Sequence, residues 1–407
     1  MNRILVLNAG SSSLKYALLN AAENTIKAVC ATGIVEKIGQ KSQIVKHAYS
    51  KEEGEMEKLR FDENNIENHK SALEFTLSLL SKHSNPKSIK TVGHRVVHGG
   101  LHLTEAQLVN ESVIDAIRDA IPLAPLHNPA NLLGIETAME IFPTSVKHVA
   151  AFDTSFHSNM PKHAFLYGIP IEYFEKHGIR KFGFHGLSHE FVMNQAASYL
   201  RKPADSLNLI TCHIGAGSSL CCIKNGVSID TTMGFTPLEG LIMATRCGDI
   251  DAATVFYMMK HLKMSAEEIE TMMVKKSGWL GLSGHQDARD MKLASLRGEE
   301  QAVIAERTVA HRIRKYLGSY YWNLGGKVDA VVFTAGLGEN YAELRELCFK
   351  NSEEFGFEID PAANKHAHLA GGIAEISSSN SKKKILVVPT NEEWNIAEKA
   401  LRIVNDQ

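Results

Sequence analysis

Two stretches, ILVLNAGSSSL at residues 4–14 and LITCHIGAGSSL at residues 209–220, decide the fold of this 407-residue chain. Each is an apolar run typical of a strand, followed by a turn that contains Ala-Gly-Ser-Ser and by further strand-like residues. After the second stretch, Asn225-Gly226 is a strong signal for a two-residue hairpin turn. The stretches lie about half a chain apart, so they predict a duplicated domain in which each half opens with a β-hairpin. A chance likeness of two Gly/Ser turns is the alternative.

Length and composition fit two globular domains. A domain of about 200 residues is of ordinary size, and 44% hydrophobic with 22% charged residues excludes disordered and fibrous classes. The formal net charge of −2 argues against a nucleic-acid partner and against a polybasic membrane-binding surface. Any positive charge that binds an anionic ligand must therefore be local.

Cysteine usage and hydropathy predict a cytoplasmic protein. The six cysteines form no CxxC pair and show no zinc-type spacing, so we expect free thiols in a reducing compartment. The apolar run at residues 4–7 is too short for a secretory signal. No run approaches the ~18 apolar residues of a membrane-spanning helix, so we expect no membrane partner.

Hydrophobic periodicity predicts strands and helices in both halves, and hence an α/β fold. Strands are expected at 91–97, 146–152, 329–333 and 385–388, and helices at 71–83, 112–120, 131–141, 252–262, 266–274, 301–324 and 392–404. Residues 40–70 and 377–384 are interpreted as polar excursions from the core elements, and the second of them as a solvated turn. Several predicted strands end in Gly, Asp, Asn or His, and ligands of open α/β sheets bind outside the carboxyl ends of strands.

Three small-residue loops are candidates for phosphate binding. They are residues 8–15, which end in Lys15, residues 215–219, and residues 334–340, after which a helix is predicted from Tyr341. Glycine allows a close approach of the backbone, and amides and hydroxyls then donate to phosphate oxygens. The P-loop pattern GxxxxGK[ST] is absent. Each loop alone also fits a plain turn, but three together indicate a nucleotide or polyphosphate ligand.

Two arginines stand where a merely solvated charge is unusual. Arg95 lies in an apolar strand run, and Arg246 lies in a turn rich in Gly and Asp. Each forms either a structural ion pair or a planar contact with a carboxylate or phosphate. His185, between Phe184 and Gly186, is either a structural histidine or a shielded donor.

Two acids are candidates for a metal site. Asp153 follows a predicted strand, a position that suits a metal or water ligand and equally a helix N-cap. Glu392 opens the last predicted helix and suits Mg²⁺ bound through water. We expect Thr390 or Asn391 to cap that helix, with Glu393 and Thr390 forming a capping box.

The chain resembles the acetate kinase family, which includes propionate kinase, in nine segments that run in the family's order. The segments are NAGSSSLKY, GHRVVHGG, PLAPLHNPANLLGI, FDTSFH, GFHGLSH, CHIGAGSSL, MGFTPLEGLIMATRCGD, FTAGLGEN and PTNEE. The resemblance implies the actin/Hsp70/sugar-kinase superfold, with two duplicated ribonuclease-H-like α/β domains and an inter-domain cleft. It also implies a domain of residues 1–150 plus 391–407 on the acyl-substrate and metal side, and a nucleotide-binding domain of residues 151–390.

The activity that this resemblance implies is ATP + acetate ⇌ ADP + acetyl phosphate by direct in-line transfer, with Mg²⁺ (or Mn²⁺), in a homodimer. Two variants of the activity stay open, because propionate could be the main acid and GTP or pyrophosphate could be the donor. A pocket difference of one methylene is worth only about 1–3 kcal/mol. A non-catalytic, nucleotide-dependent switch is a further alternative, against which Arg95, Arg246 and His185 argue, since a switch needs no carboxylate pocket.

The resemblance also implies a role for each matching residue. Asn8 and Glu392 match the metal site, with Ser11, Ser13 and Lys15 beside the phosphates. Arg95 matches the carboxylate-binding arginine, Arg246 and His185 match the stabilisers of the phosphoryl group, Asp153 matches the catalytic acid, and His127 matches a second active-site histidine. The acyl methyl pocket is implied to consist of Val97, Leu126, Phe184 and Pro237. The implied nucleotide contacts are His213, Ile214, Gly215, Ala216, Gly217, Asp287, Ala288, Arg289, Gly336, Leu337, Gly338, Glu339 and Asn340.

Several positions depart from the family's pattern. Ala216 stands where the family usually has Asn, and Ala335 replaces a usual Gly. Ala244 and Cys247 flank Arg246 in place of Gly and Ser, and Leu187 replaces Thr. The segment at residues 283–289 is one residue shorter and lacks its aromatic residue. That segment belongs to the nucleotide contacts, which leaves the choice of phosphoryl donor open.

Overall fold

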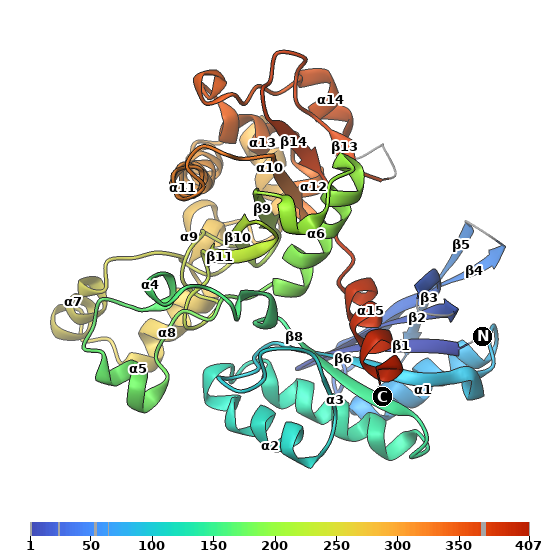
Figure 1. Cartoon of the computed structure of the whole chain (residues 1–407). Helices are drawn as coiled ribbons and strands as arrows, with labels where there is room; N and C mark the ends of the chain where they lie inside the picture. The colour runs from blue at the N-terminus through green and yellow to red at the C-terminus, as the bar shows by residue number, and fades with distance from the viewer. Residues whose placement is uncertain (1, 23–24, 53–54, 64, 368–371, 407) are drawn as a thin grey trace. The chain divides into compact units, whose positions relative to one another are not determined.

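The computed structural model describes residues 2–22, 25–52, 55–63, 65–367 and 372–406, and they form two compact units (Figure 1). Unit 1 comprises the chain up to Ser158 and again from Asn391, and unit 2 comprises Asn159–Thr390. The expected boundary at 150/151 is wrong by eight residues. The reason is that β8 (Lys147–Phe152) pairs in parallel with β6 (Ile89–Val96), which keeps residues 151–158 with the first sheet.

Unit 1 is built on one sheet, which has eight strands within the described residues, in the order β5-β4-β3-β2-β1-β6-β8-β7. The other strands are β1 (Asn2–Gly10), β2 (Ser13–Ala22), β3 (Thr25–Glu36), β4 (Gln43–Glu52), β5 (Glu55–Glu63) and β7 (Gln107–Leu108). The helices are α1 (His69–Ser81), α2 (Glu111–Asp119), α3 (Asn128–Ile141) and α15 (Glu392–Asn405).

Helices cover both faces of the unit 1 sheet. Leu5 and Leu7 of β1 share a core cluster with residues of α1 and α3. Because successive side chains of a strand point to opposite faces, Val6 faces the other side, where α15 packs. There a Cβ on Gly93 would lie 2.7 Å from Ile396 of α15, so only glycine allows the helix to approach β6 this closely. The central strands are therefore buried on both faces.

Unit 2 is built on a sheet with the order β11-β10-β9-β12-β14-β13. Its strands are β9 (Leu209–Ile214), β10 (Ser218–Lys224), β11 (Val227–Thr231), β12 (Ala330–Thr334), β13 (Ala374–Glu375) and β14 (Lys384–Val387). Its helices are α4 (Lys162–Phe165), α5 (Glu172–His177), α6 (Gly186–Leu200), α7 (Ala253–His261), α8 (Ala266–Lys275), α9 (Gly278–Ser283), α10 (Ala288–Leu296), α11 (Glu300–Asn323), α12 (Ala335–Asn340), α13 (Ala342–Phe349) and α14 (Pro361–His366). Ile210 and Cys212 of β9 pack in the core with α11, whereas Thr211 bonds to α6 on the opposite face.

The two sheets share one topology, which confirms the predicted duplication. In each, the opening strand is paired with an antiparallel hairpin partner on one edge and with a parallel strand on the other. The orders β3-β2-β1-β6-β8 and β11-β10-β9-β12-β14 correspond strand for strand. The turn at Asn225-Gly226 joins β10 and β11 as predicted, with both residues at positive φ (50° and 75°), as a type I′ turn requires.

Three local predictions are wrong. Residues 40–70 are largely a β-hairpin, β4–β5, whose strands extend the unit 1 sheet; positions 53–54 and 64 lie outside the described residues. Residues 335–340 are helix α12 rather than a glycine loop. The predicted capping box of Thr390 and Glu393 does not form, because Glu393 pairs with Lys15; Asn391 as the cap of α15 is confirmed, since it accepts from the Trp394 amide at 3.0 Å.

Among the described residues, no helix combines the length and apolar character needed to cross a bilayer.

Candidate active site

The loop that follows β6 in unit 1 is held by two asparagines of α3. The side chain of Asn128 accepts from the His98 amide at 3.1 Å and donates to the His98 carbonyl at 2.9 Å. Asn131 accepts from the Val97 amide at 3.0 Å and donates to the Ala9 carbonyl of β1 at 2.7 Å. The carboxyl ends of β1 and β6 are therefore tied together, so the side chains at both strand ends are fixed relative to each other.

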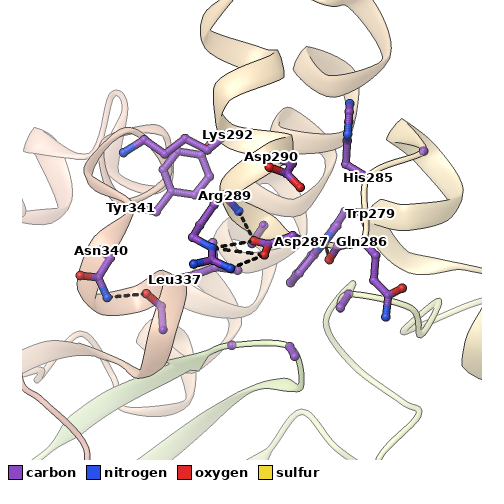
Figure 2. Close-up of a pocket in the computed structure, with 16 residues that line it drawn as sticks. Trp279, His285, Gln286, Asp287, Arg289, Asp290, Lys292, Leu337, Asn340 and Tyr341 are labelled. Carbon is purple, nitrogen blue, oxygen red and sulfur yellow. Dashed lines mark hydrogen bonds and ion pairs between the residues drawn. The ribbon is translucent and has the colours of Figure 1, made fainter. Parts of the chain in front are cut away.

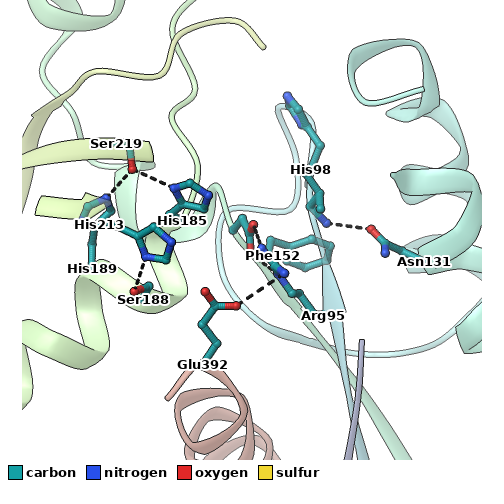
Figure 3. Close-up of polar contacts among 12 residues, drawn as sticks. Arg95, His98, Asn131, Phe152, His185, Ser188, His189, His213, Ser219 and Glu392 are labelled. Atoms are coloured by element: carbon teal, nitrogen blue, oxygen red, sulfur yellow. Dashed lines mark hydrogen bonds and ion pairs between the residues drawn. The ribbon is translucent and has the colours of Figure 1, made fainter. Parts of the chain in front are cut away.

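Arg95 is held by carboxylates (Figure 3). Its Nε and Nη2 donate to the two oxygens of Asp153 at 2.9 and 2.7 Å, and its Nη1 lies 3.5 Å from Glu392. Burial alone would lower the pKa of Arg95, but the carboxylates of Asp153 and Glu392 outweigh it and raise that pKa above its ordinary value. Burial raises the pKa of Asp153, and the Arg95 guanidinium opposes this rise.

This geometry changes the role of Asp153. The sequence led us to the hypothesis that Asp153 organises a metal-bound water or orients Arg246 or His185. Asp153 is only 2% exposed and both of its oxygens accept from Arg95. It therefore orients Arg95, whose Nη1 faces Glu392.

The start of α15 brings two glutamates to the strand ends of unit 1. Glu392 lies near Arg95, and Glu393 pairs with Lys15 at 2.5 Å. Asn8 is the cross-strand partner of Lys15 in the β1–β2 hairpin, whose turn holds Ser11 and whose second strand begins at Ser13. Among the described residues, no three His, Cys, Asp or Glu side chains gather closely enough to hold a metal ion. Asn8 and Glu392 nevertheless fit Mg²⁺, which takes oxygen donors and often needs only one or two from protein when a phosphate supplies the rest.

In unit 2, His185 and Arg246 meet at the second glycine loop. A Cβ on Gly217 would lie 3.3 Å from Nε2 of His185 and 3.7 Å from Nη1 of Arg246. His185 itself has a positive φ of 58° and precedes the first residue of α6. Two of the residues predicted to stabilise a phosphoryl group thus flank the backbone loop predicted to bind phosphate.

Arg246 carries a charge that no acid neutralises within the described part of the chain. Its Nη1 donates to the Pro237 carbonyl at 2.9 Å and lies 3.6 Å from the Met243 sulfur. Burial lowers the pKa of its guanidinium. A half-buried cation without a counter-ion favours an anionic ligand, so Arg246 differs sharply from Arg95, which is paired with two carboxylates.

A pocket of about 900 Å³ opens beside this loop in unit 2 (Figure 2). Eight of the predicted nucleotide contacts line it: Gly215, Ala216, Asp287, Ala288, Arg289, Gly336, Leu337 and Asn340. Asp287 caps α10 and pairs with Arg289 at 2.5 Å, and this hydrogen bond lowers the pKa of Asp287 to about 2. The volume and the polar rim suit a nucleotide-sized ligand.

Five predicted nucleotide contacts do not line this pocket. Ile214 is a core residue, and Gly338 packs against the backbone of β9 and β12. Glu339 accepts from the amides of Ala335 and Thr390 at 2.9 and 3.2 Å, so it braces the loop. Gly217 lies at His185, and His213 stacks on the His185 ring with centroids 4.1 Å apart.

The departures from the family's pattern have structural counterparts. Ala335 has φ +67°, a left-handed conformation that costs an alanine roughly 1–2 kcal/mol and a glycine nothing. Ala216 contributes its carbonyl, which accepts from the Ala244 amide at 3.0 Å and so ties the Arg246 turn to the glycine loop. In the shortened segment, the Trp279 indole donates to the Gln286 carbonyl at 3.1 Å.

The predicted acyl pocket stays a prediction. Val97 and Phe184 are buried, Pro237 holds Arg246 through its carbonyl, and Leu126 is 54% exposed. His127 precedes α3 and makes no side-chain cap.

The comparison with known proteins identifies the family, since the model of the acetokinase family matches residues 3–398. The chain belongs to the acetokinase family. An acetate kinase from Acetivibrio thermocellus is 45% identical over 409 residues, which cover 99% of both chains, and one from Thermoanaerobacterium thermosaccharolyticum is 46% identical with the same coverage.

Solved structures agree with this membership. The acetate kinase of Porphyromonas gingivalis superposes with a TM-score of 0.90 at 38% identity, over 99% of this chain and 100% of that one. A propionate kinase from Francisella tularensis gives a TM-score of 0.91 at 38% identity, with the same coverage. The duplicated sheets described above are therefore those of an acetokinase.

Sequence reasoning missed several residues that support the site. Asn128 and Asn131 fix the strand ends of unit 1, and in unit 2 the Ser219 hydroxyl bonds to both His185 and His189. The helix predicted at 131–141 excluded Asn128, whereas α3 begins at Asn128, so that a spacing of three places both asparagines on one face.

The buried His98 makes stability depend on pH. Its Nδ1 accepts from the Gly100 amide at 2.8 Å, and burial lowers its pKa to about 4. Between pH 6.5 and 4 the unfolded chain binds a proton that the folded chain does not, so the free energy of unfolding falls as pH falls. His98→Gln should reduce this slope by up to about 1.4 kcal/mol per pH unit, measured by urea denaturation. Identical slopes for wild type and variant across that window would contradict this account.

Proposed function

We propose that this protein is a short-chain carboxylate kinase that transfers the γ-phosphoryl group of ATP to acetate, reversibly, with propionate as a weaker substrate. The carrying observation is the unneutralised Arg246 beside Gly217 and His185. The similarity to acetate kinases along the whole chain supports the choice of acid. The pocket lined by glycine loops supports a nucleotide as donor.

The chemistry requires charge neutralisation more than proton transfer. Acetate is ionised at neutral pH, so a carboxylate oxygen forms the new P–O bond while the bond to the β-phosphate oxygen breaks, and ADP leaves as an anion without needing a proton. Negative charge on the equatorial oxygens must be stabilised, and the reactants must be aligned. Arg246 and His185 supply N–H donors for those oxygens.

The two arginines have different tasks in this proposal. Arg95 is locked by Asp153 and offers its remaining N–H groups to the acid, which fixes the direction of the nucleophile. Arg246 meets the phosphoryl group, where charge rearranges during transfer. Mg²⁺ (or Mn²⁺) bound near Asn8 and Glu392 would neutralise phosphate charge.

An exposed apolar helix of unit 2, α7, supports a protein partner for this chain. No residue of α7 is buried, and Phe256, Tyr257 and Met259 are 58%, 58% and 43% exposed. We propose that this apolar helix binds a second copy of the chain in a homodimer.

The described cysteines are all free thiols, which supports the cytoplasm as the compartment. Cell fractionation tests this localisation.

The activity is tested by trapping acyl phosphate with hydroxylamine while acid and donor are varied. We expect product with acetate and ATP, less with propionate, and little with pyrophosphate. Product with pyrophosphate but not with ATP would identify pyrophosphate as the phosphoryl donor in place of ATP. No product with any acid would favour a nucleotide-dependent switch.

Arg246→Leu should lower kcat by at least about 100-fold, because one transition-state donor and its charge are lost, while the KM for acetate changes little. Arg180→Leu is the matched control, because Arg180 is a half-buried arginine of unit 2 whose pKa is also lowered by burial and which lies over the Phe165 ring. A raised acetate KM with unchanged kcat in Arg246→Leu would assign Arg246 to substrate binding.

The dimer is tested by light scattering. The wild type should show about twice the chain mass of 44.8 kDa, and the double variant Phe256→Glu, Tyr257→Glu should shift toward the single mass, because buried carboxylates would be unpaired. Trp322→Glu, at an 83% exposed position on α11, is the control. A wild type that scatters as a monomer at micromolar concentration would refute the dimer.

A further inference from the structure

A chain of hydrogen bonds leads from the central strand of unit 2 to His185, and Figure 3 shows its part from His189 through Ser219 to His185. Thr211 Oγ1 on β9 lies 2.7 Å from Nδ1 of His189, and Nε2 of His189 lies 2.8 Å from Ser219 Oγ. Ser219 Oγ lies 2.9 Å from Nδ1 of His185. Thr211, His189 and Ser219 are all 0% exposed. We call these three residues the supporting chain of His185.

When the Ser219 hydroxyl donates to one of its two histidines, the hydrogen count leaves two arrangements of the supporting chain. A hydroxyl has one hydrogen and a neutral imidazole has one N–H. In the first arrangement, Thr211 donates to His189, His189 donates to Ser219, and Ser219 donates to Nδ1 of His185, which leaves the hydrogen of His185 on Nε2. In the second arrangement each hydrogen bond runs in the opposite direction: His185 donates from Nδ1, Ser219 donates to His189, and His189 donates to Thr211. Nε2 of His185 then presents a lone pair. The hydroxyl of Ser219 can donate to only one of its two histidines, so it decides between them.

The surroundings of Nε2 favour the first arrangement. Nε2 lies at the Gly217 loop beside the cationic Nη1 of Arg246, so an anion bound there would meet a lone pair in the second arrangement and an N–H in the first. The His213 ring stacks on His185 at an interplanar angle of 21°, and Nδ1 of His213 is 2.8 Å from Ser188 Oγ. This stack fixes the plane of the His185 ring, so in the neutral ring the tautomer decides what Nε2 presents.

We propose that Ser219, with His189 and Thr211 behind it, is a positioning residue that sets the tautomer of His185, so that Nε2 is a hydrogen-bond donor to a phosphoryl group at the Gly217 loop. A neutral ring held in this way donates without a net charge of its own, while Arg246 supplies the charge. The tautomer itself is independent of which acid or donor the enzyme uses, and only its kinetic consequence rests on the proposed function.

The tautomer is measured by long-range ¹H–¹⁵N NMR of protein with labelled histidine, with His185→Gln to assign the signal. In the wild type at pH 7.5 we expect His185 to be protonated on Nε2 alone. In Ser219→Ala the Nδ1–H form should become populated. Ser228→Ala, which removes another buried hydroxyl of the same sheet, is the control and should leave the signal unchanged. A wild-type His185 protonated on Nδ1, or a tautomer that Ser219→Ala does not change, would overturn the proposal.

Kinetics test the consequence with a second pair of variants at the remote end of the supporting chain. Thr211→Val keeps the shape but removes the donor to His189, whereas Thr211→Ser keeps the hydroxyl. We expect Thr211→Val and Ser219→Ala to lower kcat about tenfold or more with the KM values for acid and nucleotide little changed, and Thr211→Ser to restore kcat.

The NMR and kinetic measurements distinguish a failure of the proposed function from a failure of this inference. A wild type without acyl phosphate formation but with the expected tautomer would refute the proposed function and leave the supporting chain standing. A changed tautomer with unchanged kcat would overturn the link between the supporting chain and phosphoryl transfer.

Discussion

The central strand of each unit, β1 in unit 1 and β9 in unit 2, is covered on both faces and hydrogen-bonded along both edges. Burial on both sides fixes the strand's register, because a slip by one residue would move every side chain to the other face. The turn after each central strand is therefore held in place, and with it the backbone that is exposed at the strand's carboxyl end. The second copy of this arrangement presents Gly215 and Gly217 to His213, His185 and Arg246.

The chain achieves local positive charge with a net charge of −2 by treating its two key arginines differently. Arg95 is surrounded by carboxylates that fix the direction of its guanidinium and neutralise most of its positive charge. Arg246 is held by a carbonyl and a sulfur, so its position is fixed while its charge stays available to a ligand. The same type of side chain therefore serves in two ways. Arg95 is a rigid contact with a fixed direction, and Arg246 is a positive charge that remains available to a ligand.

The sequence predicted the duplication, several of the longer helices though not α6, and eight of the 16 residues that line the pocket, because these depend on local periodicity and on short ordered motifs. It could not predict the hairpin β4–β5, since its strands carry many charged residues and read as a solvated loop. It also missed the partner of Asp153. Arg95 and Asp153 are 58 residues apart, and only the parallel register of β6 and β8 brings their strand ends together. The supporting chain of His185 depends in the same way on contacts between α6, β9 and β10.

The discontinuity of unit 1 has a consequence for biosynthesis. The helix α15, which covers one face of the first sheet and brings Glu392 to Arg95, is made only after all of unit 2. Domains usually fold as units during synthesis, in the order in which they leave the ribosome. Here the order is inverted, because unit 2 is complete while the first sheet still exposes the apolar surface around Gly93. The part of the protein that is synthesised first can therefore bury this face of its sheet only after the last helix has been made.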